Sequence, residues 1–161
     1  ARAGVTRALI YTHFKSKDEV YLECLTAARD ELEAAFSAAA AAEAGPEAQL
    51  RAGLTAYYTF VLNRSNAWDV LFGGGAAIAG PLAHEAAERR FQTAERIAAL
   101  VMLAAPELPR DDAVVHAHAL SGAGEQLTKW WRRHPEVSLE EIVERTMDVI
   151  WGGLEQAIAR L

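Results

Sequence analysis

The sequence predicts an all-α protein, and three features indicate this fold class. Apolar residues recur at steps of three and four along most of the chain, which is the period of a helix with one buried face. No segment of useful length alternates apolar and polar residues as a strand would. Of the 161 residues, 52% are hydrophobic, and the mean hydropathy of zero is typical of a globular chain. This length suffices for one well-buried domain with a small appendage.

Residues 1–17, ARAGVTRALIYTHFKSK, predict a helix end, a tight turn and a second short helix. Gly4 stands where a left-handed residue is needed, and Thr6 is a good N-cap. Ile10 and Phe14 lie four residues apart, so they share the buried stripe of the short helix. Its other side chains are left to face outward. This is the helix-turn-helix plan, in which the second helix enters the major groove of DNA.

The charge distribution agrees with one nucleic-acid-binding end. Residues 1–17 contain four basic residues and no acidic one, whereas the whole chain has a net charge of −6. A basic tip on an acidic body is typical of a protein that contacts phosphate at one end only. The acidic remainder argues against a second nucleic-acid surface.

The run AGVTRALIYTHFKSKDEVYLECL resembles the DNA-binding domain of the TetR family of bacterial transcriptional regulators. The resemblance rests on a glycine turn, a capping threonine, a helix ending in tyrosine-x-histidine-phenylalanine, and a lysine that opens the next helix. The residues that carry it are Ala3, Gly4, Val5, Thr6, Tyr11, His13, Phe14 and Lys17. The family has a first helix and most of a second before this point, so we expect the biological protein to extend further at its N-terminus.

The resemblance assigns DNA contacts to the short helix and to the start of the next one. Arg7 is expected to donate a bidentate pair to a guanine edge, and Lys17 to meet a phosphate. The alternative for both is a solvated charge, and the alternative for Tyr11 is packing against the core of the tip itself. The predicted DNA-contacting residues are Thr6, Arg7, Ala8, Leu9, Tyr11, Thr12, His13 and Lys17.

A long helix from Asp18 to about Ala42 is predicted to join this tip to the body. We place the domain boundary within it, so that residues 1–22 are the C-terminal part of the helix-turn-helix domain and residues 23–161 form a helical ligand-binding and dimerisation domain. Cys24 is the sole cysteine, which excludes an internal disulfide and suits a reducing cytoplasm. We expect it to be a small buried hydrophobe.

Punctuation by glycine, proline and capping residues divides the body into further helices. Ser138, with Glu141 three residues later, predicts a capping box that opens the last one. The expected segments are a helix over 47–63, a short helix capped by Ser65 or Asn66, a glycine-rich stretch over 73–80, a helix from Pro81 to about Ala104, a helix from Arg110 or Asp111 to His134, and a last helix after Ser138.

Large side chains in the body suggest a ligand pocket, because the resemblance implies a pocket among these helices. Tyr57 or Tyr58 is expected to offer a hydroxyl inside an apolar cavity, which would orient a guest. The alternative is that most of these residues are ordinary core. The glycine-rich stretch is a candidate entry gate, and the effector is expected to be apolar or aromatic. The candidates are Tyr57, Tyr58, Phe60, Trp68, Phe72 and Phe91.

Residues 128–155 resemble the C-terminal end of TetR-like regulators, in which the last two helices of each subunit pair with the same two of a partner as a four-helix bundle. Glycines within these helices cost roughly 1 kcal/mol each relative to alanine, and a close approach across an interface would offset that cost. The alternative is packing within one chain. The predicted interface residues are Leu120, Gly124, Leu127, Trp131, Ile142, Ile150, Trp151 and Leu154.

Signals for catalysis or a metal are poor. His84 and Glu88 are four residues apart, but solvation on a helix surface explains them, and His116 and His118 point to different sides of a helix. There is no phosphate-binding glycine loop and no nucleophile elbow. No apolar run is long enough to span a bilayer, and no signal peptide is visible. We therefore expect a cytoplasmic protein without enzymatic activity, cofactor or membrane partner.

Together these features predict a homodimeric, ligand-responsive repressor that a small apolar or aromatic effector releases from a palindromic operator on double-stranded DNA. Two alternatives within regulation stay open, namely an activator and a regulator that needs a corepressor. An alternative from another class is a helical small-molecule carrier or enzyme whose DNA-binding tip is vestigial.

Overall fold

The computed structural model describes residues 12–73, 94–103 and 105–160, and these residues form helices and no strand, which confirms the all-α prediction. None of the described helices is long and apolar enough to cross a membrane. The helices are α2 (Lys17–Ala41), α3 (Pro46–Asn63), α4 (Ser65–Trp68), the π-helical turn η1 (Asp69–Gly73), an unlabelled helix over residues 94–103, α6 (Arg110–Trp131) and α7 (Leu139–Ile158).

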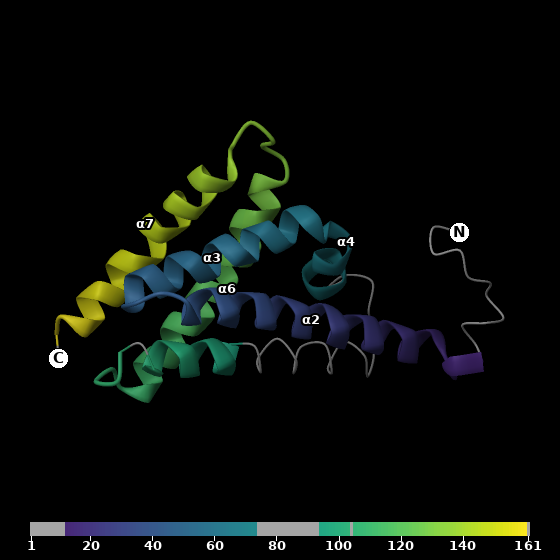
Figure 1. The fold of residues 1–161 in the computed structure, drawn as a ribbon, viewed down its shortest axis with the longest axis horizontal. Coiled ribbons are helices and arrows are strands. Elements are labelled where there is room, and N and C mark those ends of the chain that lie inside the picture. The colour runs from purple at the N-terminus through teal and green to yellow at the C-terminus, as the bar shows by residue number, and fades with distance from the viewer. Residues whose placement is uncertain (1–11, 74–93, 104, 161) are drawn as a thin grey trace.

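The helices pack around α3, which lies between α2 and α7 (Figure 1). Helix α2 runs along one side of the molecule, and α6 and α7 form a pair joined by a turn at the top of the view. The first residues of α2 lie at the opposite end of the molecule from the last residues of α7. Helix α2 is therefore the element that reaches from the N-terminal segment into the body.

The limits of α2 follow from its caps. The Ser16 hydroxyl accepts a hydrogen bond of 3.1 Å from the backbone N–H of Glu19, and acidic residues occupy the first turn, where the helix dipole favours them. After the helix ends, Gly45 has φ of +90°, a left-handed conformation that glycine adopts without strain, and Pro46 opens α3. The predicted helix is thus present, within one residue at each end.

Cys24 is exposed, so the prediction that it is buried was wrong. The buried positions of α2 on this stretch are Leu25, Ala28 and Leu32, which recur at steps of three and four. Cys24 precedes the first of them and falls beside the buried stripe rather than on it. A stripe read from sequence alone can be misplaced by one position in this way.

The cap predicted for α4 is also wrong. Ser65 is already the first helical residue, and Arg64 occupies the N-cap position without a side-chain hydrogen bond. The backbone explains this, because the Arg64 N–H bonds to the Phe60 carbonyl and the Trp68 N–H bonds to the Arg64 carbonyl. The chain therefore passes from α3 into α4 with hardly a break, and α4 continues directly into the wider π-helical turn η1.

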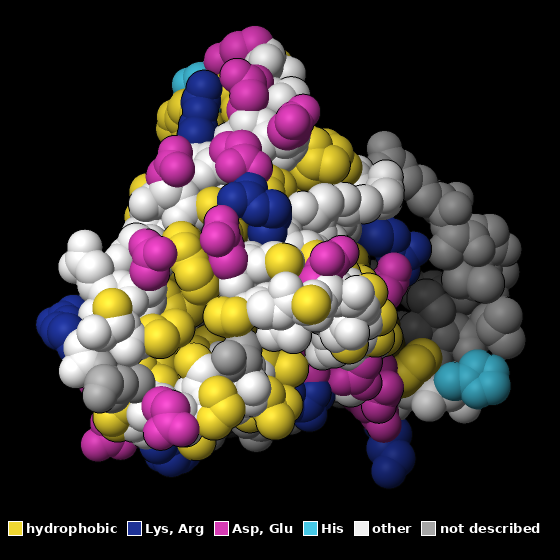
Figure 2. All heavy atoms as spheres, turned by 60° about the vertical axis from the view of Figure 1, so that its left-hand side comes forward, with side chains coloured by type: hydrophobic (Ala, Val, Ile, Leu, Met, Phe, Trp, Pro, Cys, Tyr) yellow, Lys and Arg dark blue, Asp and Glu magenta, His cyan; other side chains and the backbone are white. Residues whose placement is uncertain are grey.

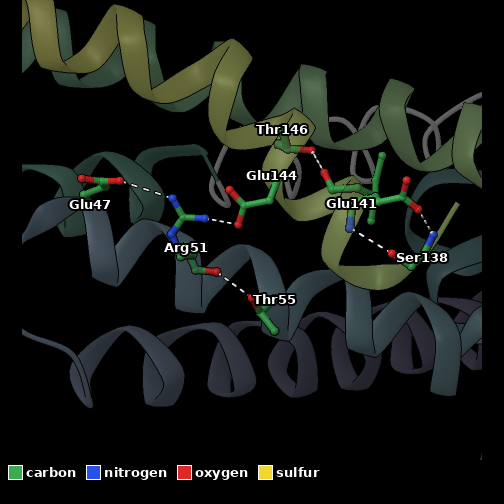
Figure 3. Close-up of polar contacts among 8 residues, drawn as sticks. Glu47, Arg51, Thr55, Ser138, Glu141, Glu144 and Thr146 are labelled. Atoms are coloured by element: carbon green, nitrogen blue, oxygen red, sulfur yellow. Dashed lines mark hydrogen bonds and ion pairs between the residues drawn. The ribbon is translucent and has the colours of Figure 1, made fainter.

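Polar contacts fix α7 against α3 (Figure 3). Arg51 of α3 forms ion pairs with Glu144 of α7 and with Glu47 one turn earlier. Side chains this exposed contribute little, typically under about 1 kcal/mol. The Arg51–Glu144 pair therefore links the two helices at the surface, and their buried faces supply most of the stabilisation.

The predicted capping box at the start of α7 is confirmed (Figure 3). The Ser138 N–H donates to the Glu141 carboxylate at 2.8 Å, and the Glu141 N–H donates to the Ser138 hydroxyl at 3.1 Å. These hydrogen bonds favour the charged form of Glu141 and lower the pKa of its carboxyl group. Helix α6 ends at Trp131, three residues before the predicted end at His134.

Candidate functional site

A cavity of about 530 Å³ lies among α2, α3, η1, the helix over 94–103 and α6. Its wall is mainly apolar and includes Leu25 and Phe36 of α2, Leu54 and Tyr57 of α3, and Leu120 of α6. Its size falls within the range of small-molecule sites, and an apolar wall with a few polar groups is their usual composition. This cavity is the candidate binding site.

Two of the predicted ligand-binding residues, Tyr57 and Phe72, line this cavity. Tyr58, Phe60 and Trp68 lie in the core instead, with 0%, 5% and 1% of their surface exposed, and they are not part of the cavity wall. Successive residues of a helix point about 100° apart, so Tyr57 faces the cavity while Tyr58 faces α7. Phe91 and residues 74–80 of the predicted gate over 73–80 lie outside the described residues, and Gly73 is the last residue of η1.

Several wall residues were missed as ligand-binding residues. Leu25, Leu32 and Phe36 of α2 are not among the residues predicted to bind a ligand, and Leu120 and Gly124 are predicted for the subunit interface. Gly124 lies against the Tyr57 ring, and a Cβ added there would stand 3.7 Å from it, at ordinary van der Waals distance. Apolar residues at helical spacing mark a buried stripe without showing what lies beside it, so the sequence does not separate these wall residues from the core.

The Tyr57 hydroxyl joins three helices through hydrogen bonds. The indole N–H of Trp68, on α4, donates to the Tyr57 oxygen at 3.0 Å, and the Tyr57 oxygen lies 3.0 Å from the Thr128 hydroxyl on α6. Since the tyrosine oxygen accepts from Trp68, its own proton is available to Thr128. Burial raises the pKa of Tyr57 above its ordinary value, so the phenol stays neutral at physiological pH.

From Trp68 the contacts continue into η1 and reach α2. The Arg132 guanidinium stacks 5.2 Å from the centre of the Trp68 ring and binds both carboxylate oxygens of Asp69. The Tyr21 hydroxyl donates to the Val70 carbonyl at 3.2 Å. A continuous set of contacts thus runs from the cavity wall through η1 to the N-terminal part of α2.

Charged side chains at the cavity are paired with one another. Glu33 of α2 forms ion pairs with Arg29, one turn earlier, and with Arg96 on the helix over 94–103. Arg29 also lies 3.3 Å from Asp30. Among the wall residues that the structure describes, two basic and two acidic groups therefore balance, and they leave no net charge that would demand an ionic ligand.

The predicted interface residues are largely enclosed within their own chain. Five of them are buried, and Leu127, Ile150 and Trp151 are partly buried against the core. Helix α7 packs against α3 and α6, and these five residues are covered within their own chain. These five are Leu120, Gly124, Trp131, Ile142 and Leu154.

A different face of the same two helices exposes apolar surface. Val115 and Trp130 of α6 are 64% and 37% exposed, and Val149 of α7 is 65% exposed. A Cβ added at Gly122 or Gly153 would meet no atom of the described residues within 4 Å. Within this part of the chain, neither glycine is required by a close packing contact.

Most of the predicted DNA-contacting residues, from Thr6 to Tyr11, lie outside the described residues. Thr12, His13 and Lys17 are exposed at the start of the described chain, next to the cap of α2. Among the described residues no three His, Cys, Asp or Glu side chains are grouped as a metal site. His116 contacts the Asp112 carbonyl of its own helix, and His84 and Glu88 are not described.

Two family models match the chain. One, described as the tetracyclin repressor-like C-terminal domain, matches residues 46–153, and the other, described as bacterial regulatory proteins of the tetR family, matches residues 1–24. The first covers the cavity-bearing body, and the second covers the basic N-terminal segment.

Comparison with individual proteins gives the same result. The chain is 25% identical, over 168 aligned residues, to the HTH-type transcriptional activator FasR of Mycolicibacterium smegmatis, with 95% of this chain and 70% of the relative covered. A TetR-like transcriptional regulator from Rhodococcus sp. RHA1 shares the fold, with a TM-score of 0.72 at 23% identity, over 96% of this chain and 80% of that one. These families and relatives are transcriptional regulators and not enzymes.

Proposed function

The chain belongs to the TetR family of transcriptional regulators, and on that premise we propose that it is a homodimeric repressor whose operator affinity is set by a small molecule in the cavity beside Tyr57. The observation that carries this proposal is the apolar cavity of about 530 Å³ whose wall is tied, through the Tyr57 hydroxyl, to the helix that leads to the DNA-binding segment. The effector is an apolar or aromatic molecule, because the wall is apolar and its charges are paired.

The proposed mechanism has two states that differ in the position of α2. A guest that presses on Tyr57 favours one arrangement of Trp68 and η1, and the bond from Tyr21 to Val70 carries that arrangement to α2. The ligand shifts the balance only by its difference in affinity for the two states. Couplings of this kind are typically about 1–3 kcal/mol, or roughly 5- to 150-fold in affinity.

The proposed dimer uses the exposed face of α6 and α7 that Val115, Trp130 and Val149 define. Gly122 and Gly153 would allow close approach of the partner, since no described residue of their own chain occupies the space beside them. The proposed interface thus uses the predicted helices, α6 and α7, but a face of them other than the one that carries the buried residues predicted for the interface. Two-fold symmetry then requires half-sites about 34–36 Å apart on a palindromic operator.

DNA binding is proposed for the segment up to residue 22, with the helical body from residue 23 onward serving ligand binding and dimerisation. Within the segment, Arg7 is the proposed base-reading residue, and Lys17, which is exposed at the start of α2, is a proposed phosphate contact. Thr6, Ala8, Leu9, Tyr11, Thr12 and His13 complete the proposed contact set.

Activation is the second candidate, and a specific observation favours it. The relative from Mycolicibacterium smegmatis is named a transcriptional activator. A reporter fused to the regulated promoter separates the two directions. Deleting the regulator raises reporter output if the protein represses and lowers it if the protein activates.

A gel shift of the intact protein against its own upstream region tests DNA binding. We expect a palindrome-dependent shift that weakens steeply as salt is added, because phosphate contacts release counterions. Addition of an apolar ligand should change the shift. An absence of any salt-sensitive, palindrome-dependent shift would contradict the proposal and would favour a carrier.

A further inference from the structure

A second, smaller cavity of about 180 Å³ adjoins the first. Its wall is also apolar and includes Ala40 of α2, Leu50 of α3, Val101 of the helix over 94–103, and Leu154 of α7. Figure 2 shows hydrophobic side chains gathered in a hollow on the side of the molecule where α2 ends and α3 begins. The smaller cavity belongs to this end.

The two cavities follow one another along α2. The wall of the larger one uses α2 residues from Leu25 to Ser37, and the wall of the smaller one uses α2 residues from Phe36 to Ala41. Helix α3 shows the opposite order, with Leu54 and Tyr57 at the larger cavity and Leu50 at the smaller one. At 1.5 Å per residue, the combined stretch of α2 is about 24 Å long. The two spaces are thus arranged end to end.

The two cavities meet at five described residues that line both of them, namely Phe36, Ser37, Ile97, Leu100 and Leu120, and Phe36 is the aromatic one. Its ring extends from α2 to the backbone of α3 at Gly53, where an added Cβ would lie 2.5 Å from the Phe36 Cζ atom. Only glycine at this position lets the ring occupy its place. The ring is the far end of a side chain that is only partly buried, so it moves more easily than the backbone on either side.

We propose that Phe36 is the specificity-determining residue that sets how long a ligand the regulator accepts, and that the ligand class is elongated apolar chains. In its observed position the ring borders both cavities and packs against Gly53 of α3. When the ring turns away from Gly53, the smaller cavity becomes a continuation of the larger one. This inference rests on the proposed function, in which the larger cavity is the effector site.

The chemistry of the walls supports an elongated apolar guest. The charged residues Arg29, Asp30, Glu33 and Arg96 line the larger cavity, and none of the described residues that line the smaller one is charged. A chain with one polar end can therefore leave that end near the ion pairs, while its apolar tail extends along α2 past Phe36. A compact polar molecule would gain nothing from the second space.

The test is the binding of straight-chain alcohols, from 1-octanol to 1-hexadecanol, to the intact protein, measured by displacement of the neutral fluorescent probe N-phenyl-1-naphthylamine. The longest of these chains exceed the roughly 18 Å of α2 that borders the larger cavity. Each methylene that enters an apolar cavity raises affinity by roughly fourfold. In the wild type, affinity should rise with chain length and then level off at the alcohol that fills the larger cavity. In Phe36→Ala, the rise should continue to longer alcohols.

Two further variants make the test specific. Gly53→Ala keeps Phe36 but displaces its ring, so it should also change the chain length at which affinity levels off. If Phe36→Ala does not fold, Gly53→Ala tests the role of the ring in its place. Phe72→Ala is the matched control, because Phe72 lines only the larger cavity. It should change affinity for all alcohols alike and leave the levelling-off length in place.

The possible results distinguish failure of the role proposed for Phe36 from failure of the larger cavity as the effector site. If the alcohols bind but level off at the same length in wild type, Phe36→Ala and Gly53→Ala, Phe36 does not set ligand length and the inference is overturned. If no alcohol displaces the probe from any folded variant, the cavity is not an apolar ligand site, and that part of the proposed function fails as well.

Discussion

Replacing Tyr57 by phenylalanine should destabilise the protein more than the same replacement at its neighbour, Tyr58. The Tyr57 hydroxyl serves both Trp68 and Thr128, whose side chains are 1% and 0% exposed. Its removal deprives two buried polar groups of a partner, each at about 1–3 kcal/mol, for a total of roughly 2–4 kcal/mol after relaxation.

Tyr58→Phe is the matched control. The Tyr58 hydroxyl lies 2.7 Å from Thr146, but the Thr146 hydroxyl already donates to the Ile142 carbonyl at 2.7 Å. Loss of the Tyr58 hydroxyl therefore leaves no buried donor without an acceptor, and only about 0.5–1.5 kcal/mol is lost. The two variants remove the same atom from adjacent residues of one helix, so their difference isolates the network.

Urea and thermal unfolding at one fixed protein concentration measure both variants. At this chain length each kcal/mol lowers Tm by about 2–4 °C, so Tyr57→Phe should lower Tm by roughly 9 °C and Tyr58→Phe by roughly 3 °C. If Tyr58→Phe proves as destabilising as Tyr57→Phe, the reasoning about buried partners is refuted.

Three other predictions concern the interface, the last helix and the DNA-binding segment. Val149→Asp should convert the dimer to a monomer in sedimentation, and the subunit should stay folded because Val149 is 65% exposed. The control is Leu62→Asp, at a position of α3 that is 57% exposed. If the Val149→Asp variant remains a dimer, the interface lies elsewhere. Hydrogen bonds from Ser138 lower the pKa of Glu141 in the folded state, so its contribution to stability is present above its ordinary pKa of 4.5 and is lost as pH falls through the lower folded value. Glu141→Gln keeps a residue type that can form a capping box, so it should remove this loss of stability at low pH, measured by unfolding at a series of pH values. An unchanged pH profile would show that the Glu141 carboxylate does not cause the loss. Arg7→Ala should relax sequence preference and cost about 1–3 kcal/mol on cognate DNA, whereas Lys17→Ala should weaken all sequences alike and lower the salt slope by about 1. Equal losses on cognate and random DNA for Arg7→Ala would count against base reading.

Features that depend on neighbours in sequence were predicted well. The capping box of Ser138 and Glu141, the break at Gly45 and Pro46, and the start of α2 beside Ser16 all depend on residues a few positions apart. Such features are decided by local hydrogen bonds and by allowed backbone angles, which a single sequence displays. The all-α fold followed from the same local signals.

Features that depend on which face of a helix meets which partner were predicted less well. Tyr57 and Tyr58 are indistinguishable in sequence, yet one lines the cavity and the other is core. Leu120 and Leu154 were assigned to a partner subunit, but their own chain buries them. Apolar periodicity marks a buried stripe without saying what buries it, and a helix with two apolar faces leaves the choice to tertiary packing.

Phe36 and Gly53 show the same limit. In sequence, Phe36 is one more apolar residue of a long helix, and Gly53 is an unexplained glycine within another. Only the packing of α2 on α3 brings the ring against the glycine. A close approach between residues 17 positions apart leaves no periodic signal in a single sequence.

The most direct test of the account is the operator affinity of the intact protein with and without a ligand that binds the cavity, measured in wild type and in Tyr57→Phe. The account predicts a change of roughly 5- to 150-fold in the wild type and a smaller change in Tyr57→Phe, even where the ligand still binds. Ligand bound in the cavity with no change in the operator affinity of the wild type would contradict it.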